Sequence, residues 1–438
     1  MDEKMIQKYI NILENELIYA QGCTEPIAIA FAAAKAREVL GDFPERLEVG
    51  ASGNIIKNVK SVIIPNTNGL YGIEAAAVAG AVAGNSNKKL ELLASLSGTD
   101  IEKVKSLLAK ENYCTVHRLN NGEKLHIIIE AEAKGHRVFV EVKRCHTNVT
   151  KIVKNGEVIY EEKNTESSDE SQNCITTDYS CLSVEAIIKF ANSVDLERVR
   201  GILERQYECN MKISEEGLTN FYGANVGKIL RKNGDDSVRN RAKYSAAAGS
   251  DARMNGCLLP VVINSGSGNQ GITASVPVIV YSQEWGKTKE QCLRAMLVSN
   301  LIAIHQKSMI GSLSAFCGAV TAACGSGAAL TYMKGGTLKQ IEMTIKNALG
   351  NMSGLFCDGA KSSCAAKIAT TVDAAIMAHE MSMEGQVFGH GEGIVDEEIE
   401  VTMRNVGRIG AEGMDCVDNI ILDIMVGGSR KFSNFVDF

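Results

Sequence analysis

The sequence predicts an α+β protein: a mainly α-helical domain with glycine-rich loops at strand ends, and a small inserted α+β domain. Three observations predict this class. Apolar residues recur at helical spacing near both ends of the chain, short runs of alternating character fill residues 113–143, and many of the 41 glycines stand beside Ser, Ala or Asn. A chain of 438 residues can bury a large core and divide into more than one unit.

The first elements predicted in chain order are two helices. Apolar residues at three- and four-residue spacing predict a helix over 4–20, and Pro26 suits the first turn of a small-residue helix over 27–40. Cys23 then lies at or just before a helix N-terminus. Because the helix dipole favours a thiolate there, we expect a lowered pKa for the Cys23 thiol.

Two strands are predicted next, over 47–51 and 59–65, and each runs into a polar loop that contains glycine. Such loops suit a small polar ligand, which backbone N–H groups and side-chain amides can bind. A helix over 73–83 follows. A further helix over 101–110 and alternating runs at 113–119, 125–131 and 136–143 predict a compact α+β insert with a small antiparallel sheet.

The rest of the chain is predicted to be mainly helical. A strand-like stretch over 258–281 encloses the glycine-rich segment 265–271, and the clearest helices cover 293–305, 318–333 and 364–380. We therefore expect residues 1–97 and 176–438 to form the main, mostly helical domain, with residues 98–165 as the insert.

Composition narrows the classes of protein. Apolar residues make up 45% of the chain and charged residues 22%, as in a soluble globular protein. A net charge of −6 implies no broad cationic surface, so nucleic acid and membranes are not expected as partners. Residues 1–17 lack the pattern of a secretory signal, and we expect a cytoplasmic protein. Small-residue helix faces favour a homodimer.

The thirteen cysteines are the most informative residues. In a reducing compartment they are expected to serve burial, catalysis or metal ligation rather than a disulfide framework. Cys317 with Cys324 and Cys357 with Cys364 share a C-x6-C spacing, and their local sequences are similar at an offset of 40 residues. This spacing leaves two interpretations open: small residues buried at close helix contacts, or soft thiolate ligands gathered from different turns.

Several motifs together resemble the L-cysteine desulfidase family, which is related to the α chain of iron–sulfur L-serine dehydratases. They are QGCTEP at 21–26, SGN at 52–54, SGSGNQG at 265–271, HQKSMIGSLSAFCGAV at 305–320, GLFCDGAKSSC at 354–364 and GAEGMDCVDNIILDIM at 410–425. The similarity spans nearly the whole chain. Each motif is weak alone, but their combination is specific.

The resemblance implies a [4Fe–4S] cluster held by Cys317, Cys357 and Cys364, with one iron open to substrate and Cys324 not needed as a ligand. It also implies α,β-elimination of L-cysteine to sulfide and aminoacrylate, which water converts to pyruvate and ammonia. Cys23 matches the base of the family pattern, and Lys307 is a second candidate for the proton or for the substrate carboxylate.

The remaining site residues are predicted from the polar loops. Asn54, Asn66, Asn269 and Gln270 are expected to hold the amino acid's carboxylate and amino group, against the simpler interpretation that they cap loops. Gly53 and Gly268 would let the backbone approach the ligand. The histidines of the insert are expected at strand or turn positions rather than in a metal site.

Three alternatives stay open. An L-serine dehydratase would use the same fold and cluster but expel hydroxide. Some related serine dehydratases carry a C-terminal cysteine, and residues 434–438 of this chain contain none, which favours the desulfidase. A non-catalytic iron–sulfur redox sensor would use the same cysteines without producing pyruvate. A pyridoxal-phosphate lyase is the weakest alternative.

Overall fold

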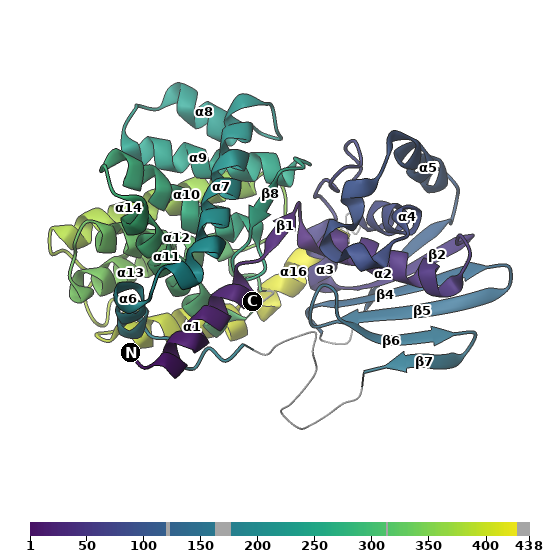
Figure 1. Cartoon of the computed structure of the whole chain (residues 1–438), viewed down its shortest axis with the longest axis horizontal. Helices are drawn as coiled ribbons and strands as arrows, with labels where there is room; N and C mark the ends of the chain where they lie inside the picture. The colour runs from purple at the N-terminus through teal and green to yellow at the C-terminus, as the bar shows by residue number, and fades with distance from the viewer. Residues whose placement is uncertain (120–122, 163–176, 312–313, 427–438) are drawn as a thin grey trace, which may run out of the picture.

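The structure is a computed structural model, and it describes residues 1–119, 123–162, 177–311 and 314–426. Residues 434–438, on which one argument for the desulfidase depends, lie outside these ranges. Figure 1 shows two lobes side by side. The sheet lobe holds residues 24–162, and the helical lobe holds residues 3–21 and 177–413. The predicted class, a mainly helical α+β protein, is confirmed.

A six-stranded sheet lies in the sheet lobe, in the order β3-β2-β4-β5-β6-β7. Its strands are β2 (Arg46–Ser52), β3 (Cys114–Leu119), β4 (His126–Ala133), β5 (His136–Lys143), β6 (Val149–Lys154) and β7 (Glu157–Glu161). β2 runs parallel to β3 and antiparallel to β4. The sheet thus joins residues on both sides of the boundary predicted at residue 97. The domain limits 1–97, 98–165 and 176–438 stay predictions.

Alanine-rich helices cover this sheet. The lobe contains α2 (Thr24–Leu40), α3 (Gly53–Val59), α4 (Ile73–Ala83), the 3₁₀ helix η1 (Ser86–Ser95) and α5 (Gly98–Leu108). α2 packs on β4 and β5, and α4 packs on α2. The two helices approach so closely that a Cβ at Gly80 would lie 2.1 Å from the carbonyl oxygen of Ala30. Small side chains therefore set the spacing between these layers.

The strand predicted over 59–65 is wrong. α3 occupies residues 53–59, and within 59–65 the structure has only an isolated bridge from Ile63 to Tyr71. Val59 is the last residue of α3, and residues 60–65 form turns and this bridge, with Val62 and Ile64 buried. A short run of buried apolar residues therefore does not by itself identify a strand.

The strand-like stretch 258–281 is also mostly helical. β8 (Pro260–Val262) pairs with β1 (Tyr19–Gln21), and α10 (Gly268–Glu284) takes up the rest. Nearly every residue of α10 is buried, on all sides of the helix, so its apolar residues form no helical stripe. Gly271 lets α10 begin against β8, because a Cβ there would lie 2.0 Å from the carbonyl oxygen of Val262.

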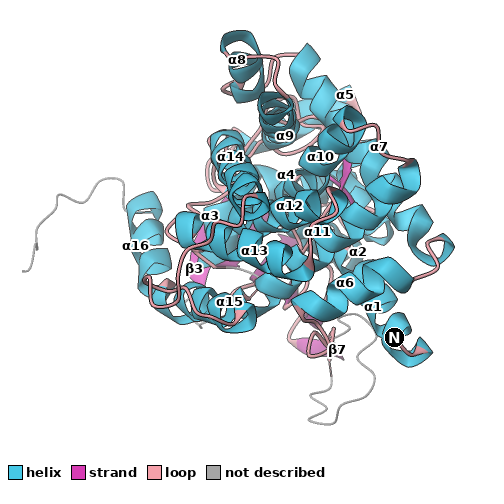
Figure 2. Ribbon diagram, turned by 90° about the vertical axis from the view of Figure 1, so that its left-hand side faces the viewer, coloured by secondary structure: helices cyan, strands magenta, loops and turns pink. Residues whose placement is uncertain are grey.

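The helical lobe surrounds one buried helix, α12 (Gly318–Met333). α10, α11 (Lys289–Ile310), α13 (Leu338–Met352) and α14 (Cys364–Met383) pack around it (Figure 2). The other helices are α1 (Glu3–Glu16), α6 (Val184–Ser193), α7 (Glu197–Thr219), α8 (Val226–Asn233), α9 (Val238–Met254), α15 (Ile399–Arg408) and the π-helix η2 (Ile409–Gly413). α16 (Asp415–Val426) then packs against α3 of the sheet lobe.

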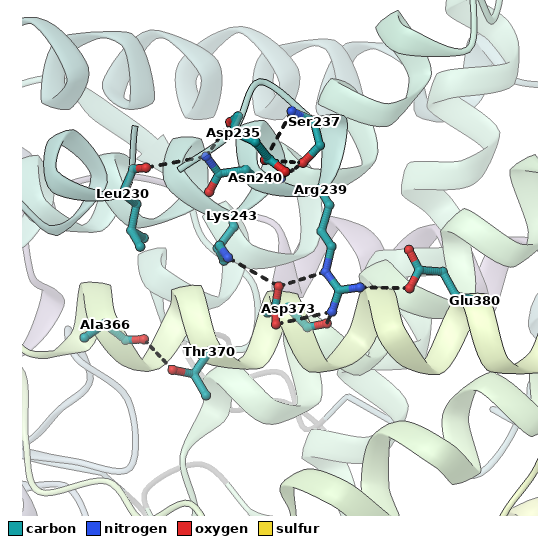
Figure 3. Close-up of polar contacts among 10 residues, drawn as sticks. All are labelled: Leu230, Asp235, Ser237, Arg239, Asn240, Lys243, Ala366, Thr370, Asp373 and Glu380. Carbon is teal, nitrogen blue, oxygen red and sulfur yellow. Dashed lines mark hydrogen bonds and ion pairs between the residues drawn. The ribbon is translucent and has the colours of Figure 1, made fainter. Parts of the chain in front are cut away.

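An ion-pair network fixes α9 against α14 (Figure 3). The guanidinium of Arg239 donates to both carboxylate oxygens of Asp373, at 2.9 and 3.3 Å, and to Glu380 at 2.9 Å. Lys243 also contacts Asp373, at 3.4 Å. α9 ends near Arg253 and α14 begins at Cys364. The network therefore holds the register of two helices whose other ends meet at the site described next.

Candidate active site

A cavity of ≈ 180 Å³ is lined by residues of both lobes. Five helices begin at it. Cys23 is the N-cap of α2, Asn54 lies in the first turn of α3, Ser267 is the N-cap of α10, Cys317 is the N-cap of α12, and Cys364 opens α14. Because the N-terminal end of a helix carries partial positive charge and free N–H groups, this arrangement favours anions.

The three cysteines predicted as ligands all line this cavity. Residues 315–317 pair with 355–357: the Cys317 N–H donates to the Leu355 carbonyl at 3.0 Å, and the Cys357 N–H donates to the Ala315 carbonyl at 2.5 Å. Burial raises the pKa of Cys317 to about 12, and the charges of Cys357 and Cys364 contribute to the rise. The three thiols are therefore electrostatic neighbours.

Cys317, Cys357 and Cys364 do not lie as close together as the ligands of a single metal ion would. Across the described ranges, no group of three or more His, Cys, Asp or Glu residues is close enough to hold one metal ion. Cys324 does not line the cavity; it lies inside α12, and its thiol faces the carbonyl oxygen of Ile345 at 4.0 Å. Cys145 is disulfide-bonded, while eleven other cysteines of the described residues are free thiols.

Cys23 occupies the predicted position, but its predicted lowered pKa is wrong. Burial raises the pKa of the Cys23 thiol, and the neighbouring carboxylate of Glu25 raises it further. The thiol donates to Oε2 of Glu25 at 3.2 Å. Thr24 and Asn58 also donate to this carboxylate, at 3.1 and 3.2 Å. The helix dipole is thus outweighed by desolvation and by a nearby negative charge.

Five cationic side chains line the cavity. Three have carboxylate partners: Lys57 pairs with Asp418, Lys367 with Asp358 and Arg144 with Glu162. The other two, Lys307 and Arg253, are in none of the ion pairs found among the described residues.

Lys307 is buried near Cys317 and Cys357, two of the cysteines predicted as ligands. Burial lowers its pKa to about 8, although the charges of Cys357 and Cys317 act in the opposite direction. The protonation of the Lys307 amine therefore depends on the negative charge in the cavity, from thiolates or from a bound anion.

The predicted substrate-binding residues divide into two groups. Asn54, Asn269 and Gln270 line the cavity, and Oδ1 of Asn54 is buried without a hydrogen-bond partner. Asn66 does not line it, because its amide donates to the carbonyl oxygens of Leu93 and Leu96 at 2.9 and 3.0 Å.

The two predicted glycines also lie outside the lining, and each makes room for a side chain of the protein. A Cβ at Gly53 would lie 2.4 Å from Leu422 of α16, and a Cβ at Gly268 would lie 2.2 Å from Nε of Arg253. Their roles toward a ligand stay predictions.

Glu25, His146 and Arg253 are among the lining residues that were not found from the sequence. Burial lowers the pKa of His146, and its Nε2 has no hydrogen-bond partner. Glu25 falls inside the QGCTEP motif, so its position next to Cys23 was an available signal. Arg253 stands near the end of an ordinary helical pattern, and nothing in its neighbourhood distinguishes it from a surface arginine.

Comparison with known proteins places this chain in a family. The sequence model described as "Serine dehydratase alpha chain" matches residues 87–423. The chain belongs to the serine dehydratase alpha chain family. The resemblance to L-cysteine desulfidases and the related L-serine dehydratase α chain, predicted from the motifs, is thereby confirmed.

This family member also has relatives that match it over nearly its whole length. A "UPF0597 protein" from Lachnoclostridium phytofermentans is 54% identical over 422 residues, which cover 96% of this chain and 100% of the relative. Proteins of the same name from Treponema denticola and Finegoldia magna are 46% and 49% identical, and cover 97% and 96% of this chain and 99% and 100% of their own lengths. Within the described residues, no helix is long and apolar enough to cross a bilayer.

Proposed function

We propose that the protein is an L-cysteine desulfidase, which converts L-cysteine to hydrogen sulfide, pyruvate and ammonia by α,β-elimination. Membership of the serine dehydratase alpha chain family supports a lyase. The observation that carries the proposal is the meeting of Cys317, Cys357 and Cys364 in one cavity with Cys23. A sulfur ligand set and a group able to move a proton then face the same small volume.

The three cysteines fit a [4Fe–4S] cluster better than a single ion. They line one cavity without converging on one point, as the ligands of a cube must. Lys307 and Lys367 supply positive charge next to these thiols, and the N-termini of α12 and α14 add N–H donors. When bound, such a cluster with one open iron supplies a Lewis acid for the leaving sulfur.

The protein's own residues would then move the α-proton. Cys23 is held as a thiol by burial, so it can act as a base only after its proton moves to Oε2 of Glu25, 3.2 Å away. The resulting thiolate removes the α-proton. The electron pair forms the Cα=Cβ bond, and the Cβ–S bond breaks with its electrons on sulfur. Glu25 returns its proton to the departing sulfide, so the carboxylate ends the cycle ionised.

L-Serine is the second candidate substrate, since the family description names a serine dehydratase. The same residues would serve, with hydroxide leaving in place of sulfide. A redox sensor of another class would need the three ligand cysteines but not a base such as Cys23 with a carboxylate partner.

Anaerobic turnover assays test the proposal. Purified, iron–sulfur-reconstituted protein is given L-cysteine or L-serine, and sulfide and pyruvate are measured. We expect kcat/KM for L-cysteine to exceed that for L-serine by about tenfold or more, since one pocket contact of about 1–3 kcal/mol gives discrimination of this order. Faster turnover of L-serine would overturn the desulfidase, and a cluster without pyruvate from either would favour the sensor.

A matched pair of variants tests the ligands. Cys317→Ser should lose the cluster's visible absorbance and its iron, whereas Cys324→Ser, seven residues along the same helix, should keep both. Equal loss in both variants, or in neither, would contradict the ligand set.

A further inference from the structure

Arg253 is a buried cation that has no ion-pair partner among the residues that the structure describes. The residue is 3% exposed and lines the cavity. Its Nη2 donates to the carbonyl oxygen of Gly22 at 3.1 Å, its Nη1 makes a long contact of 3.4 Å with Oδ1 of Asn269, and its Nε is buried with no partner. None of the ion pairs among the described residues includes Arg253.

Such an arrangement is costly unless an anion completes it. Arginine keeps its charge in proteins, and a guanidinium removed from water needs an opposite charge or a full set of hydrogen bonds. Two carbonyl-type contacts leave most of its five N–H donors unused. The flat guanidinium matches a carboxylate with two parallel hydrogen bonds.

The surroundings hold Arg253 in this position without neutralising it. Gly268, the first residue of α10, leaves the space that the guanidinium occupies, because a Cβ there would lie 2.2 Å from Nε. The N-cap end of α10 adds partial positive charge beside it. The Arg239–Asp373 network anchors the other end of α9 (Figure 3).

We propose that Arg253 binds the α-carboxylate of the amino acid substrate and so makes a free carboxylate a requirement for binding. Nη2 of Arg253 donates to the carbonyl oxygen of Gly22, the residue before Cys23, and both Arg253 and Cys23 line the cavity. A carboxylate on Arg253 therefore places Cα, one bond away, on the side of the cavity where Cys23 lies. In this role Arg253 makes the site specific for ligands with a free carboxylate. The inference rests on the proposed function only in naming an amino acid as the ligand.

Binding measurements test this without turnover. The probes are 3-mercaptopropionate and 3-mercaptopropionamide, which share a thiol and differ in the carboxylate; neither has an α-amino group. Dissociation constants are measured by anaerobic calorimetry on the reconstituted full-length protein. We expect the wild-type protein to bind the carboxylate at least about 30-fold more tightly than the amide, as a charge-assisted bidentate pair allows.

Variants then test whether Arg253 causes the preference for the carboxylate over the amide. Arg253→Gln should reduce the ratio of the two dissociation constants to about 1 while changing that of the amide by less than about threefold, and Arg253→Lys should retain part of the preference. Arg144→Gln is the matched control, because Arg144 also lines the cavity but its charge is paired with Glu162. That variant should keep the wild-type ratio.

Three outcomes overturn the inference: a wild-type ratio near 1, an Arg253→Gln variant that keeps the wild-type ratio, or one that loses both ligands equally. If Arg253→Gln does not fold, the wild-type ratio and Arg253→Lys still decide. If the protein binds 3-mercaptopropionate through Arg253 but turns over neither L-cysteine nor L-serine, the proposed function fails and the carboxylate site stands.

Discussion

Replacing Glu25 with Gln should make Cys23 more reactive and the enzyme less active. The carboxylate of Glu25 accepts a hydrogen bond from the Cys23 thiol at 3.2 Å, and the negative charge of the carboxylate raises the pKa of the thiol. Gln keeps the shape and an acceptor oxygen but removes the charge. A hydrogen-bonded charge in a buried site is worth about 1.5–3 kcal/mol, so at fixed pH the variant should hold about tenfold to a hundredfold more Cys23 thiolate.

Turnover should change in the opposite direction. Without the carboxylate there is no acceptor for the thiol's proton and no donor for the departing sulfide. Loss of a proton-transfer partner typically costs about 10²-fold or more in rate. If Glu25 had a purely structural role, replacing it would not raise the reactivity of one thiol while lowering kcat.

The assay compares alkylation with turnover. Iodoacetamide labelling of the Cys23 peptide is followed by mass spectrometry between pH 7 and 10, with the exposed Cys416 as the internal reference. Glu141→Gln is the control, since it removes a partly buried carboxylate outside the cavity. Slower or unchanged labelling of Cys23 in Glu25→Gln would refute the proton relay.

Three further predictions concern stability. Gly80→Ala should lower the free energy of unfolding by about 1–3 kcal/mol in urea titrations, because its Cβ would overlap the backbone of Ala30, whereas Gly98→Ala, which meets nothing within 4 Å, should not. Asp373→Asn should cost about 1 kcal/mol, since its ion pairs are partly exposed; an unchanged urea midpoint would exclude a clamping role. Burial raises the pKa of Cys324 to about 12, so the unfolded chain ionises first and stability should fall above pH 9, less steeply in Cys324→Ala.

Local sequence patterns predicted the helices and strands whose apolar residues follow a clear period. The helix over 73–83 is found as α4 with the same bounds, and the strand predicted over 136–143 is β5. The prediction failed where burial on all sides removes the periodic signal, as in α10. There a run of buried apolar residues looks the same whether it forms a strand or a helix.

The site was only partly predictable from the sequence. The C-x6-C spacing alone left two interpretations open, and Cys317, Cys357 and Cys364 were predicted as ligands from the resemblance to a known family. Arg253 could not be found in this way, because what distinguishes it is the lack of an ion pair among the described residues and a contact with Gly22, 231 positions away in the chain. A sequence shows which charges a chain has, but only the fold shows which of them are left without partners.

The pKa of Cys23 illustrates how long-range effects outweigh a local one. Its position at the N-cap of α2 was predicted correctly, and that position alone favours a thiolate. Burial between the lobes and the charge of Glu25 reverse the preference. If Cys23 is the base, as we propose, resting as a thiol would protect it from oxidation and from binding iron in place of the proposed ligand cysteines, since the thiolate is the reactive and ligating form. In the proposed mechanism, pairing Cys23 with a carboxylate therefore separates the thiol that would move the proton from the three cysteines proposed to bind the cluster, within a single cavity.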